Sequence, residues 1–368
     1  MLGFPGAAPP AQAASSLAHV TLSGAPIRPT HADEFIRATF ELDPIDLALT
    51  LALQLSTAMA GGPQWAEGHV VSVTADRACI GLPAVLVGGN LAALMAGVLA
   101  GEAMEIAAIK RCRLVGLQLP DDLLPGPAIG ASAGVDVGVI VKPSLGLTPD
   151  EVAEVVEAAV AGGARWIKDD EVLADPPWCR LSDRVGRVAP RLAPGVVYFA
   201  NVTGPSTDLV DRARRVVDLG ATGVMVAAVA QGLDGVLALR RADLGVPILA
   251  HRAGSGPWCR NDRFGITGAV LIDLMRAAGA DAVIVGAFGG KLFESDGEVD
   301  SNLAAARRPT DILSCTALLG GGLGAGDLAG QFLRAGGTGL VGLLGSAAYG
   351  RGRAGLARTV AAAVASLS

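Results

Sequence analysis

The chain has 368 residues, of which 51% are hydrophobic and 17% are charged, and its formal net charge is -6 at pH 7. This length accommodates a large domain with an apolar core and a second, smaller domain. The charge balance is acidic, and no cluster of Lys and Arg alternates with aromatic residues. The composition therefore argues against a nucleic-acid partner.

The cysteines favour a reducing compartment. They are odd in number, scattered and without a Cys-x-x-Cys pair: Cys79, Cys112, Cys179, Cys259 and Cys315. This pattern argues against a disulfide framework and a zinc site, and it predicts a cytoplasmic protein. Residues 1–27 are expected to form a flexible arm, because their start is rich in Ala and Pro and lacks the basic segment of a signal peptide.

The uncharged stretch from Ala78 to Gly101 is long enough to cross a bilayer. Pro83, the glycine pair at 88 and 89, and Asn90 interrupt it. Such interruptions are typical of a strand end, a turn and a buried helix, so we expect no membrane partner.

Residues 28–130 are predicted to form a small α+β domain with a ferredoxin-like order of elements. Strand-like and helix-like patterns alternate over His31–Asp43 (strand), Pro44–Ala60 (helix), Glu67–Leu86 (strand), Leu91–Ala100 (helix) and Ile109–Leu119 (strand). Asp43 is the expected N-cap of the first helix, with Pro44 at its first position. The stretch 120–130, rich in Pro and Gly, ends this domain.

Residues 131–368 are predicted to form a (β/α)8 TIM barrel, because short apolar runs alternate with helical segments rich in Ala, Leu and Arg. The expected strands are Val135–Val141, Arg165–Asp170, Val196–Val202, Gly223–Ala228, Pro247–His251, Ala282–Gly286, Ala317–Gly320 and Gly339–Leu344. Enzymes with this fold build their sites at the C-terminal strand ends. The chain's overall fold class is therefore α/β.

One run of charged residues ends the second expected barrel strand. Alternate side chains of a strand share a face, so Lys168 and Asp170 point the same way, and Glu171 follows at the start of the loop. A lysine that has added CO2 to form a carbamate would supply a third oxygen anion, and three hard oxygen ligands suit Mg2+. Taken alone, such a run is more often a solvated salt-bridge cluster.

Several ordered motifs together resemble the RuBisCO superfamily. That family carries an I-K-P-K-L-G-L segment on its first barrel strand and a K-D-D-E segment on its second. Here the matching segments read Val-Lys-Pro-Ser-Leu-Gly-Leu at 141–147 and Lys-Asp-Asp-Glu at 168–171. The resemblance continues in the same order at 251–253 (His-Arg-Ala), 289–292 (Gly-Gly-Lys-Leu) and 320–322 (Gly-Gly-Gly).

The resemblance implies a role for each charged residue of the first two motifs. Lys168 as a carbamate, Asp170 and Glu171 would hold Mg2+. Partial burial would help CO2 to add, because it lowers the pKa of a lysine. Lys142 would handle the proton at the carbon or oxygen being enolised.

The later motifs imply substrate contacts. His251 and Arg252 match a pair that contacts substrate hydroxyl and phosphate oxygens, and arginine suits phosphate geometry. Lys291 matches a lysine on a mobile lid, which excludes water and brings a cation to a developing enolate. Each of these residues also has an ordinary explanation, as a buried core histidine or a solvated loop lysine.

Glycines and an asparagine complete the implied site. Backbone N–H groups near five residues would cradle a phosphate of a small phosphorylated substrate: Gly320, Gly321, Gly322, Gly345 and Ser346. Asn90 resembles an asparagine of the small domain that reaches into a neighbouring subunit's barrel. That match implies a homodimer with an active site shared between subunits.

Departures from the family pattern argue against carboxylation of ribulose bisphosphate. Ser144 replaces a second lysine, Ile284 falls where the sixth strand carries a phosphate-binding histidine, and Gly320 replaces a serine. Gln54 stands where the family's small domain supplies a glutamate. The pattern is that of a RuBisCO-like protein (form IV), in which the groups for metal binding and enolisation persist.

The expected function is Mg2+-dependent enolisation of a phosphorylated keto-sugar or keto-acid, of the enolase, isomerase or decarboxylase type. The segment 289–296 looks closest to enzymes that decarboxylate or transcarboxylate 3-oxo sugar-acid phosphates. Alternatives are a methionine-salvage 2,3-diketo-5-methylthiopentyl-1-phosphate enolase or 5-methylthioribulose-1-phosphate isomerase, a Schiff-base aldolase, and a catalytically silent barrel that binds a phosphorylated ligand.

Overall fold

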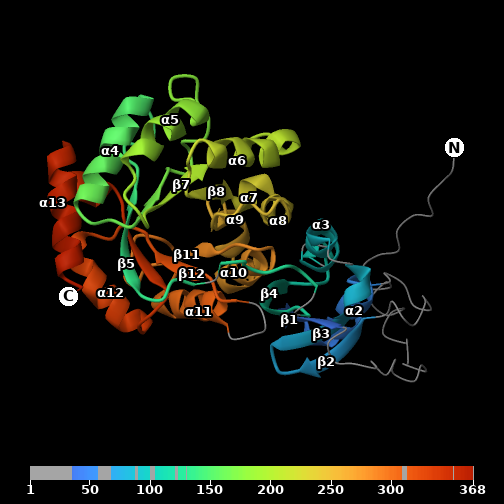
Figure 1. The fold of residues 1–368 in the computed structure, drawn as a ribbon. Helices are drawn as coiled ribbons and strands as arrows, with labels where there is room; N and C mark the ends of the chain where they lie inside the picture. The colour runs from blue at the N-terminus through green and yellow to red at the C-terminus, as the bar shows by residue number, and fades with distance from the viewer. Residues whose placement is uncertain are drawn as a thin grey trace. The chain divides into compact units, whose positions relative to one another are not determined.

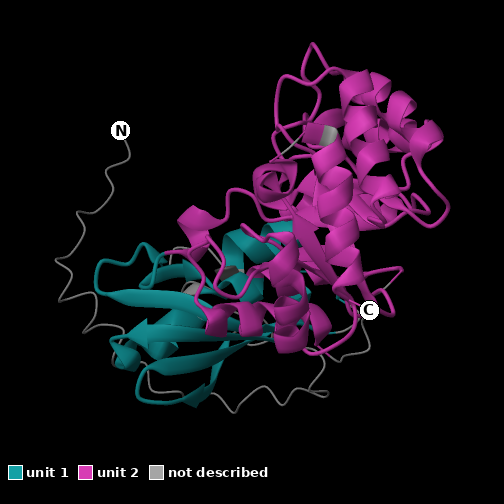
Figure 2. Ribbon diagram, turned by 90° about the vertical axis from the view of Figure 1, so that its left-hand side faces the viewer, with its two compact units in different colours: residues 1–123, 261–270 teal, residues 124–260, 271–368 magenta. Residues whose placement is uncertain are grey.

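A computed structural model describes residues 35–56, 68–87, 90–99, 104–120, 123–129, 131–308, 313–350 and 352–367. The chain forms two compact units, shown in Figures 1 and 2. Unit 1 comprises residues 1–123 and 261–270, and unit 2 comprises 124–260 and 271–368. The predicted arm at 1–27 lies outside the described residues.

Unit 1 contains a five-stranded sheet with the order β10-β4-β1-β3-β2. Its strands are β1 (Phe35–Asp43), β2 (His69–Val73), β3 (Arg77–Pro83), β4 (Arg111–Gln118) and β10 (Phe264–Ile266). The first four pair antiparallel, whereas β10 pairs parallel to β4. Its helical segments are η2 (Ile45–Leu47), α2 (Ala48–Gln54), η4 (Ala84–Leu86), α3 (Leu91–Ala93) and the π-helix η5 (Leu94–Leu99). The βαββαβ order confirms the ferredoxin-like prediction.

The predicted cap of the first helix is wrong. Asp43 is the last residue of β1, where it pairs with Arg111 of β4, and its carbonyl accepts a hydrogen bond from the Lys110 N–H at 2.7 Å. Because the ladder holds Asp43 in an extended conformation, the helical path begins only after Pro44, with no side-chain cap. The tertiary pairing thus overrides the local capping signal.

The uncharged stretch 78–101 forms the elements expected of it within the part that the structure describes. It contains most of β3, the short η4 turn, and the helix that begins at Leu91. Among the described residues, no helix combines the length and the apolar character needed to span a bilayer. All five cysteines lie in the described part, and none of them forms a disulfide.

Unit 2 contains a closed parallel barrel with the strand order β11-β12-β13-β5-β6-β7-β8-β9. The strands are β5 (Val135–Ile140), β6 (Trp166–Lys168), β7 (Val197–Asn201), β8 (Gly223–Ala227), β9 (Ile248–His251), β11 (Ala282–Gly286), β12 (Thr316–Leu319) and β13 (Leu340–Leu344). Every predicted barrel strand is confirmed, with ends that differ by at most two residues. The apolar runs predicted them well because strands buried on both faces are nearly continuous in hydrophobic residues.

Helices follow the barrel strands along the chain and lie outside them (Figure 1). They are α4 (Pro149–Ala161), α5 (Leu181–Val188), η7 (Ala189–Arg191), η8 (Ser206–Asp208), α6 (Leu209–Asp218), α7 (Ala228–Gln231), α8 (Leu233–Arg241), α9 (Gly256–Cys259), α10 (Gly268–Ala277), α11 (Asp296–Arg307), η9 (Ala325–Asp327), α12 (Leu328–Ala335), η10 (Ser346–Tyr349) and α13 (Gly352–Ala365). Thr148 and Ser295 begin α4 and α11 with capping boxes.

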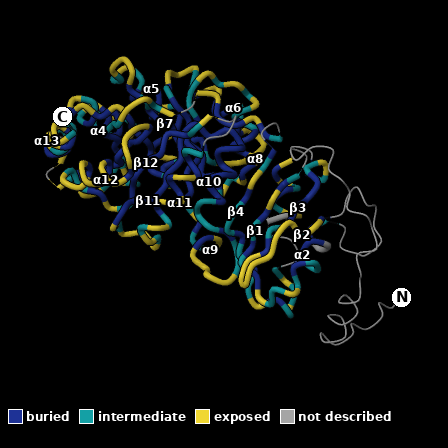
Figure 3. Tube along the Cα trace, turned by 90° about the horizontal axis from the view of Figure 1, so that it is seen from below, coloured by how far each residue is buried: buried dark blue, intermediate teal, exposed yellow. Residues whose placement is uncertain are grey.

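The barrel interior is a packed core. Side chains from successive strands meet in it, including Trp166, Phe199, Met225, Leu249 and Val341. Figure 3 shows buried residues along these strands and exposed ones mainly on the outer helices and loops. Because the interior is filled, a ligand site has to lie at a strand end, where the loops begin.

Candidate active site

Two lysines and two carboxylates meet where β5 and β6 end. Lys142 forms an ion pair with Asp170, and its Nζ also donates to the Ser144 hydroxyl at 2.8 Å. The Nζ of Lys168 lies 3.3 Å from Glu171 Oε2 and donates to the Asp169 carbonyl at 2.8 Å. The four charges therefore cancel in two separate pairs.

Burial decides the electrostatics of this cluster. Lys168 and Asp170 are each 1% exposed. Burial lowers the pKa of Lys168, although the attraction of Glu171 and Asp170 opposes this effect. A buried amine with a lowered pKa is more readily neutral, which is the form that adds CO2.

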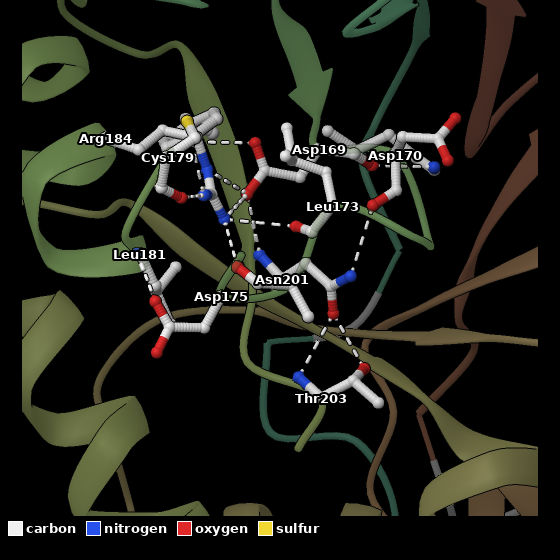
Figure 4. Close-up of polar contacts among 12 residues, drawn as sticks. Asp169, Asp170, Leu173, Asp175, Cys179, Leu181, Arg184, Asn201 and Thr203 are labelled. Atoms are coloured by element: carbon white, nitrogen blue, oxygen red, sulfur yellow. Dashed lines mark hydrogen bonds and ion pairs between the residues drawn. The ribbon is translucent and has the colours of Figure 1, made fainter. Parts of the chain in front are cut away.

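A second buried network lies behind the cluster and fixes the loop after β6 (Figure 4). Asp169 accepts two hydrogen bonds from Arg184, at 3.0 and 3.1 Å, and one from the Tyr198 hydroxyl at 2.7 Å. Arg184 is fully buried, and it also donates to the carbonyls of Leu173, Ala174 and Cys179. Asp169 therefore has a structural role, unlike its neighbours Asp170 and Glu171, which pair with the two lysines.

Asn201, at the end of β7, positions the two acidic residues through their backbone. Its Nδ2 donates to the carbonyls of Asp170 and Glu171 at 3.1 and 3.0 Å, and its Oδ1 accepts from Thr203. Figure 4 shows this side chain between Asp170 and Thr203. The sequence reasoning missed Asn201, although a polar residue that ends an apolar strand is a usable signal.

His251 ends β9 and is 8% exposed. Its Nδ1 accepts the Ala253 N–H at 3.0 Å, and its Nε2 lies 3.5 Å from Glu171 Oε2. Burial, together with the positive charges of Lys168 and Arg252, lowers the pKa of His251 well below its ordinary value. This shift favours the neutral imidazole, and because Nδ1 accepts the Ala253 N–H, the neutral form carries its proton on Nε2, which makes Nε2 a hydrogen-bond donor.

A cavity of about 450 Å³ opens above these groups. Most of the predicted site residues line it: Lys142, Glu171, His251, Arg252, Lys291, Gly320, Gly321, Gly322, Gly345 and Ser346. Lys168 and Asp170 do not line it and are buried beside it. A volume of this size suits a small organic substrate.

One wall of the cavity is glycine-rich. Gly321 and Gly322 have φ values of 133° and 97°, and a Cβ on them would lie only 3.0 Å from Leu292 Cγ and 3.2 Å from Lys291 Cγ. Only glycine is compatible with this backbone conformation and these close contacts. The Lys291 N–H donates a 2.8 Å hydrogen bond to the Gly321 carbonyl and so holds the loop after β12 in place. Within the described residues, no acceptor receives the N–H groups of Gly321 and Gly322, so they can serve a ligand.

The lining of the cavity also includes a buried ion pair between Arg252 and Glu294. Their side chains are only 7% and 3% exposed, and both line the cavity. The sequence reasoning found Arg252 and missed Glu294, because no local pattern links residues 42 positions apart.

Asn90 is not among the residues that line this cavity. It belongs to unit 1, where its Oδ1 accepts the Ala93 N–H at 3.1 Å and caps α3. Its expected contact with a neighbouring subunit stays a prediction. Ile284 lines the cavity, as its place on β11 suggests, while the Gln54 side chain lies outside the described residues.

Comparison with known proteins identifies the family. Residues 128–366 match the ribulose bisphosphate carboxylase large chain catalytic domain. A ribulose bisphosphate carboxylase-like protein from Allochromatium vinosum is 30% identical over 297 residues, which cover 75% of this chain and 64% of that protein. A 3-oxo-isoapionate-4-phosphate transcarboxylase/hydrolase from Xanthobacter autotrophicus is 35% identical over 252 residues, 63% of this chain and 60% of that protein. The chain thus spans less than two thirds of the length of these relatives.

Solved structures agree with this result. The RuBisCO-like protein MtnW from Alicyclobacillus acidocaldarius is 27% identical, with a TM-score of 0.79 over 90% of this chain and 94% of that one. An octameric ribulose-1,5-bisphosphate carboxylase/oxygenase from Pyrococcus horikoshii is 25% identical, with a TM-score of 0.82 over 92% of this chain and 89% of that one. The chain belongs to the ribulose bisphosphate carboxylase large chain family, as one of its RuBisCO-like members.

Proposed function

We propose that this protein enolises a phosphorylated keto compound and does not carboxylate ribulose bisphosphate. The observation that carries the proposal is the cluster of Lys142, Lys168, Asp170 and Glu171 beside a cavity with a glycine-rich wall. Enolisation needs a group that moves a proton next to a carbonyl and an electrostatic partner for the oxygen that becomes negative.

The residues fit Mg2+ only if Lys168 becomes a carbamate. Within the described part of the chain, no three His, Cys, Asp or Glu side chains lie close enough together to hold a metal ion. Asp170 and Glu171 supply two carboxylates, and a carbamate would supply the third. The four side chains now sum to zero charge, and converting the Lys168 cation into an anion would leave a charge of two minus, which a divalent cation neutralises.

When bound there, Mg2+ would draw electron density from the substrate carbonyl and acidify the adjacent carbon. The remaining chemistry belongs to the side chains. Lys142, which is paired with Asp170 beside the cavity, would move the proton. The neutral His251 donates from Nε2 to a substrate oxygen, and Lys291 supplies positive charge from the cavity wall.

The phosphate is proposed to lie against the wall formed by Gly320–Gly322, Gly345 and Ser346. Barrel enzymes often bind phosphate at the loops after their seventh and eighth strands, which here are β12 and β13. The unengaged N–H groups of Gly321 and Gly322 support this assignment.

A 3-oxo sugar-acid phosphate is the proposed substrate class. A relative named 3-oxo-isoapionate-4-phosphate transcarboxylase/hydrolase, 35% identical over 252 residues, supports this choice. A 3-oxo acid that breaks its bond to the carboxyl carbon leaves the bonding electrons on the neighbouring carbonyl as an enolate. The same groups that stabilise enolisation would therefore stabilise that step.

The proposed assembly is a cytoplasmic homodimer that shares its site through Asn90. Support comes from the family, since the similar enzyme from Pyrococcus horikoshii is described as octameric. Mixing inactive Asn90→Ala chains with inactive Lys142→Met chains tests this point. A shared site restores part of the activity in the mixture, and a site built from one chain restores none.

The function is tested by incubating the protein with Mg2+ and bicarbonate in D2O. The substrate panel contains a 3-oxo sugar-acid phosphate, a ketose monophosphate, a methylthio-substituted diketone phosphate and ribulose bisphosphate. We expect deuterium uptake or CO2 release with the 3-oxo acid and no carboxylation of ribulose bisphosphate. If no compound of the panel takes up deuterium or releases CO2, and Lys168→Met behaves like wild type, the proposal is contradicted and a binding protein is favoured.

A further inference from the structure

The part of the cavity wall formed by Arg252 and Glu294 carries a cation whose charge is already matched. Arg252 is paired with Glu294, and both side chains are almost fully buried. Within the described residues, this is the only hydrogen bond that the Arg252 guanidinium makes, so its other N–H groups remain available as donors. The wall therefore offers donors without offering net positive charge.

The contacts of this pair differ from those of the lysines in the same cavity. Lys142 and Lys291 both line the cavity, and Lys142 is paired with Asp170. Arg252 instead shares its charge with Glu294, and Ile284, which also lines the cavity, is apolar. An anion in direct contact with this pair would meet the Glu294 carboxylate.

Glu294 also has an oxygen that no protein group satisfies. Its Oε1 faces Arg252, whereas its Oε2 is buried and receives no hydrogen bond from any described residue. A carboxylate oxygen only accepts hydrogen bonds, so it suits a donor and opposes phosphate or carboxylate oxygens. A hydroxyl group matches both partners, because it can donate to Glu294 and accept from Arg252.

We infer that the Arg252–Glu294 pair selects a substrate that presents a neutral hydroxyl group to it, and that it rejects a second phosphate at that place. This inference rests on the proposed function for the place of the first phosphate at the glycine-rich wall. It makes Glu294 a specificity-determining residue, and it narrows the substrate class to hydroxyl-bearing monophosphates.

The test compares three ligands that differ at one end only: ribulose 1-phosphate, 5-deoxyribulose 1-phosphate and ribulose 1,5-bisphosphate. Their affinities for the full chain are measured by calorimetry with Mg2+ and bicarbonate. Wild type should bind the hydroxyl-ended ligand about tenfold or more tightly than the other two. Glu294→Gln should reverse the order for the bisphosphate, with a gain of about tenfold or more, because Arg252 then faces a neutral partner.

Asp300→Asn is the matched control, since it removes one negative charge from an exposed position on α11. It should leave the ratio of the affinities unchanged, and a general loss of folding in Glu294→Gln would lower all three affinities alike. A ratio that Glu294→Gln leaves unchanged, equal binding of mono- and bisphosphate by wild type, or no binding of any ligand would each overturn the inference. The proposed function is tested separately: it fails if the protein catalyses no deuterium exchange, whatever the affinity ratios of the three ligands are.

Discussion

Lys142 and Asp170 form an ion pair that joins the C-terminal ends of two neighbouring barrel strands, β5 and β6. Lys168, whose side chain is more deeply buried, pairs instead with Glu171. The proton carrier and the expected carbamate therefore have separate carboxylate partners. Turning Lys168 into an anion would leave Glu171 without its cation and place a third anion beside Asp170, and this links CO2 binding to metal binding.

Replacing Lys142 tests its role as the proton carrier. Lys142→Met should slow deuterium exchange into the substrate by about 10²- to 10⁴-fold, the usual size of a general acid–base contribution. The side chain is 23% exposed, so the fold should tolerate the change. Lys110→Met, an exposed lysine of unit 1, is the control and should exchange at the wild-type rate. Equal exchange rates in Lys142→Met and wild type, followed by NMR, would remove Lys142 from the mechanism.

The buried pair of Arg184 and Asp169 predicts a large effect on stability. Arg184→Met should lower the free energy of unfolding by about 3–5 kcal/mol, because Asp169 is left charged and buried without its partner. Arg187→Met on the same helix should cost less than about 1 kcal/mol, since Arg187 and Asp150 are 64% and 62% exposed. Urea denaturation measures the free energy of unfolding of both variants. Equal decreases in the two variants would contradict a stabilising role for the Arg184–Asp169 network.

Asn201 is expected to position the metal ligands without binding the metal. Asn201→Asp replaces the Nδ2 donor with an oxygen that repels the carbonyls of Asp170 and Glu171. We expect the Mg2+ concentration for half-maximal activity to rise by about 10- to 100-fold, as for other residues that orient metal ligands. Asn201→Ser, which restores a donor, should recover part of the loss. An unchanged Mg2+ requirement would show that Asn201 serves only the fold.

Asp273 predicts a dependence of stability on pH. Burial raises the pKa of its carboxyl from the ordinary 3.8 to about 6, despite the attraction of Arg308 and Arg276. The folded state therefore holds this proton more tightly than the unfolded state does. Its stabilising contribution is complete below the unfolded value and is lost as the pH rises through about 6.

Asp273→Asn should remove this loss. Relative to wild type, the variant should gain on the order of 2 kcal/mol between about pH 4 and about pH 7.5, measured by urea unfolding at both values. A difference between variant and wild type that does not change with pH would contradict the raised pKa.

The barrel was predictable because its strands are short apolar runs between polar helices. Even the ends of β5 and β11 follow the sequence pattern closely. The strand β10, only three residues long, carries too little pattern to be recognised, and its partner β4 lies far away in the sequence. Asp43 shows the opposite failure, in which a good local capping signal loses to sheet pairing.

The site was predictable only where one segment carries its chemistry. Lys168, Asp170 and Glu171 lie within four residues at the end of β6, so one short segment carries all three. Glu294 meets Arg252 across 42 residues, and Asn201 reaches backbone carbonyls 30 and 31 residues away. Such contacts form only when the closed barrel brings distant segments together, and a local sequence pattern does not predict which residues then meet.

The carbamate on Lys168 is the central claim, and it can be observed directly. The protein is incubated with 13C-labelled bicarbonate and Mg2+, and its carbon NMR spectrum is recorded beside that of Lys168→Met. The account predicts a carbamate resonance that appears in wild type, grows with Mg2+ and is absent from the variant. A wild-type spectrum without that resonance, or a resonance that persists in Lys168→Met, would contradict it.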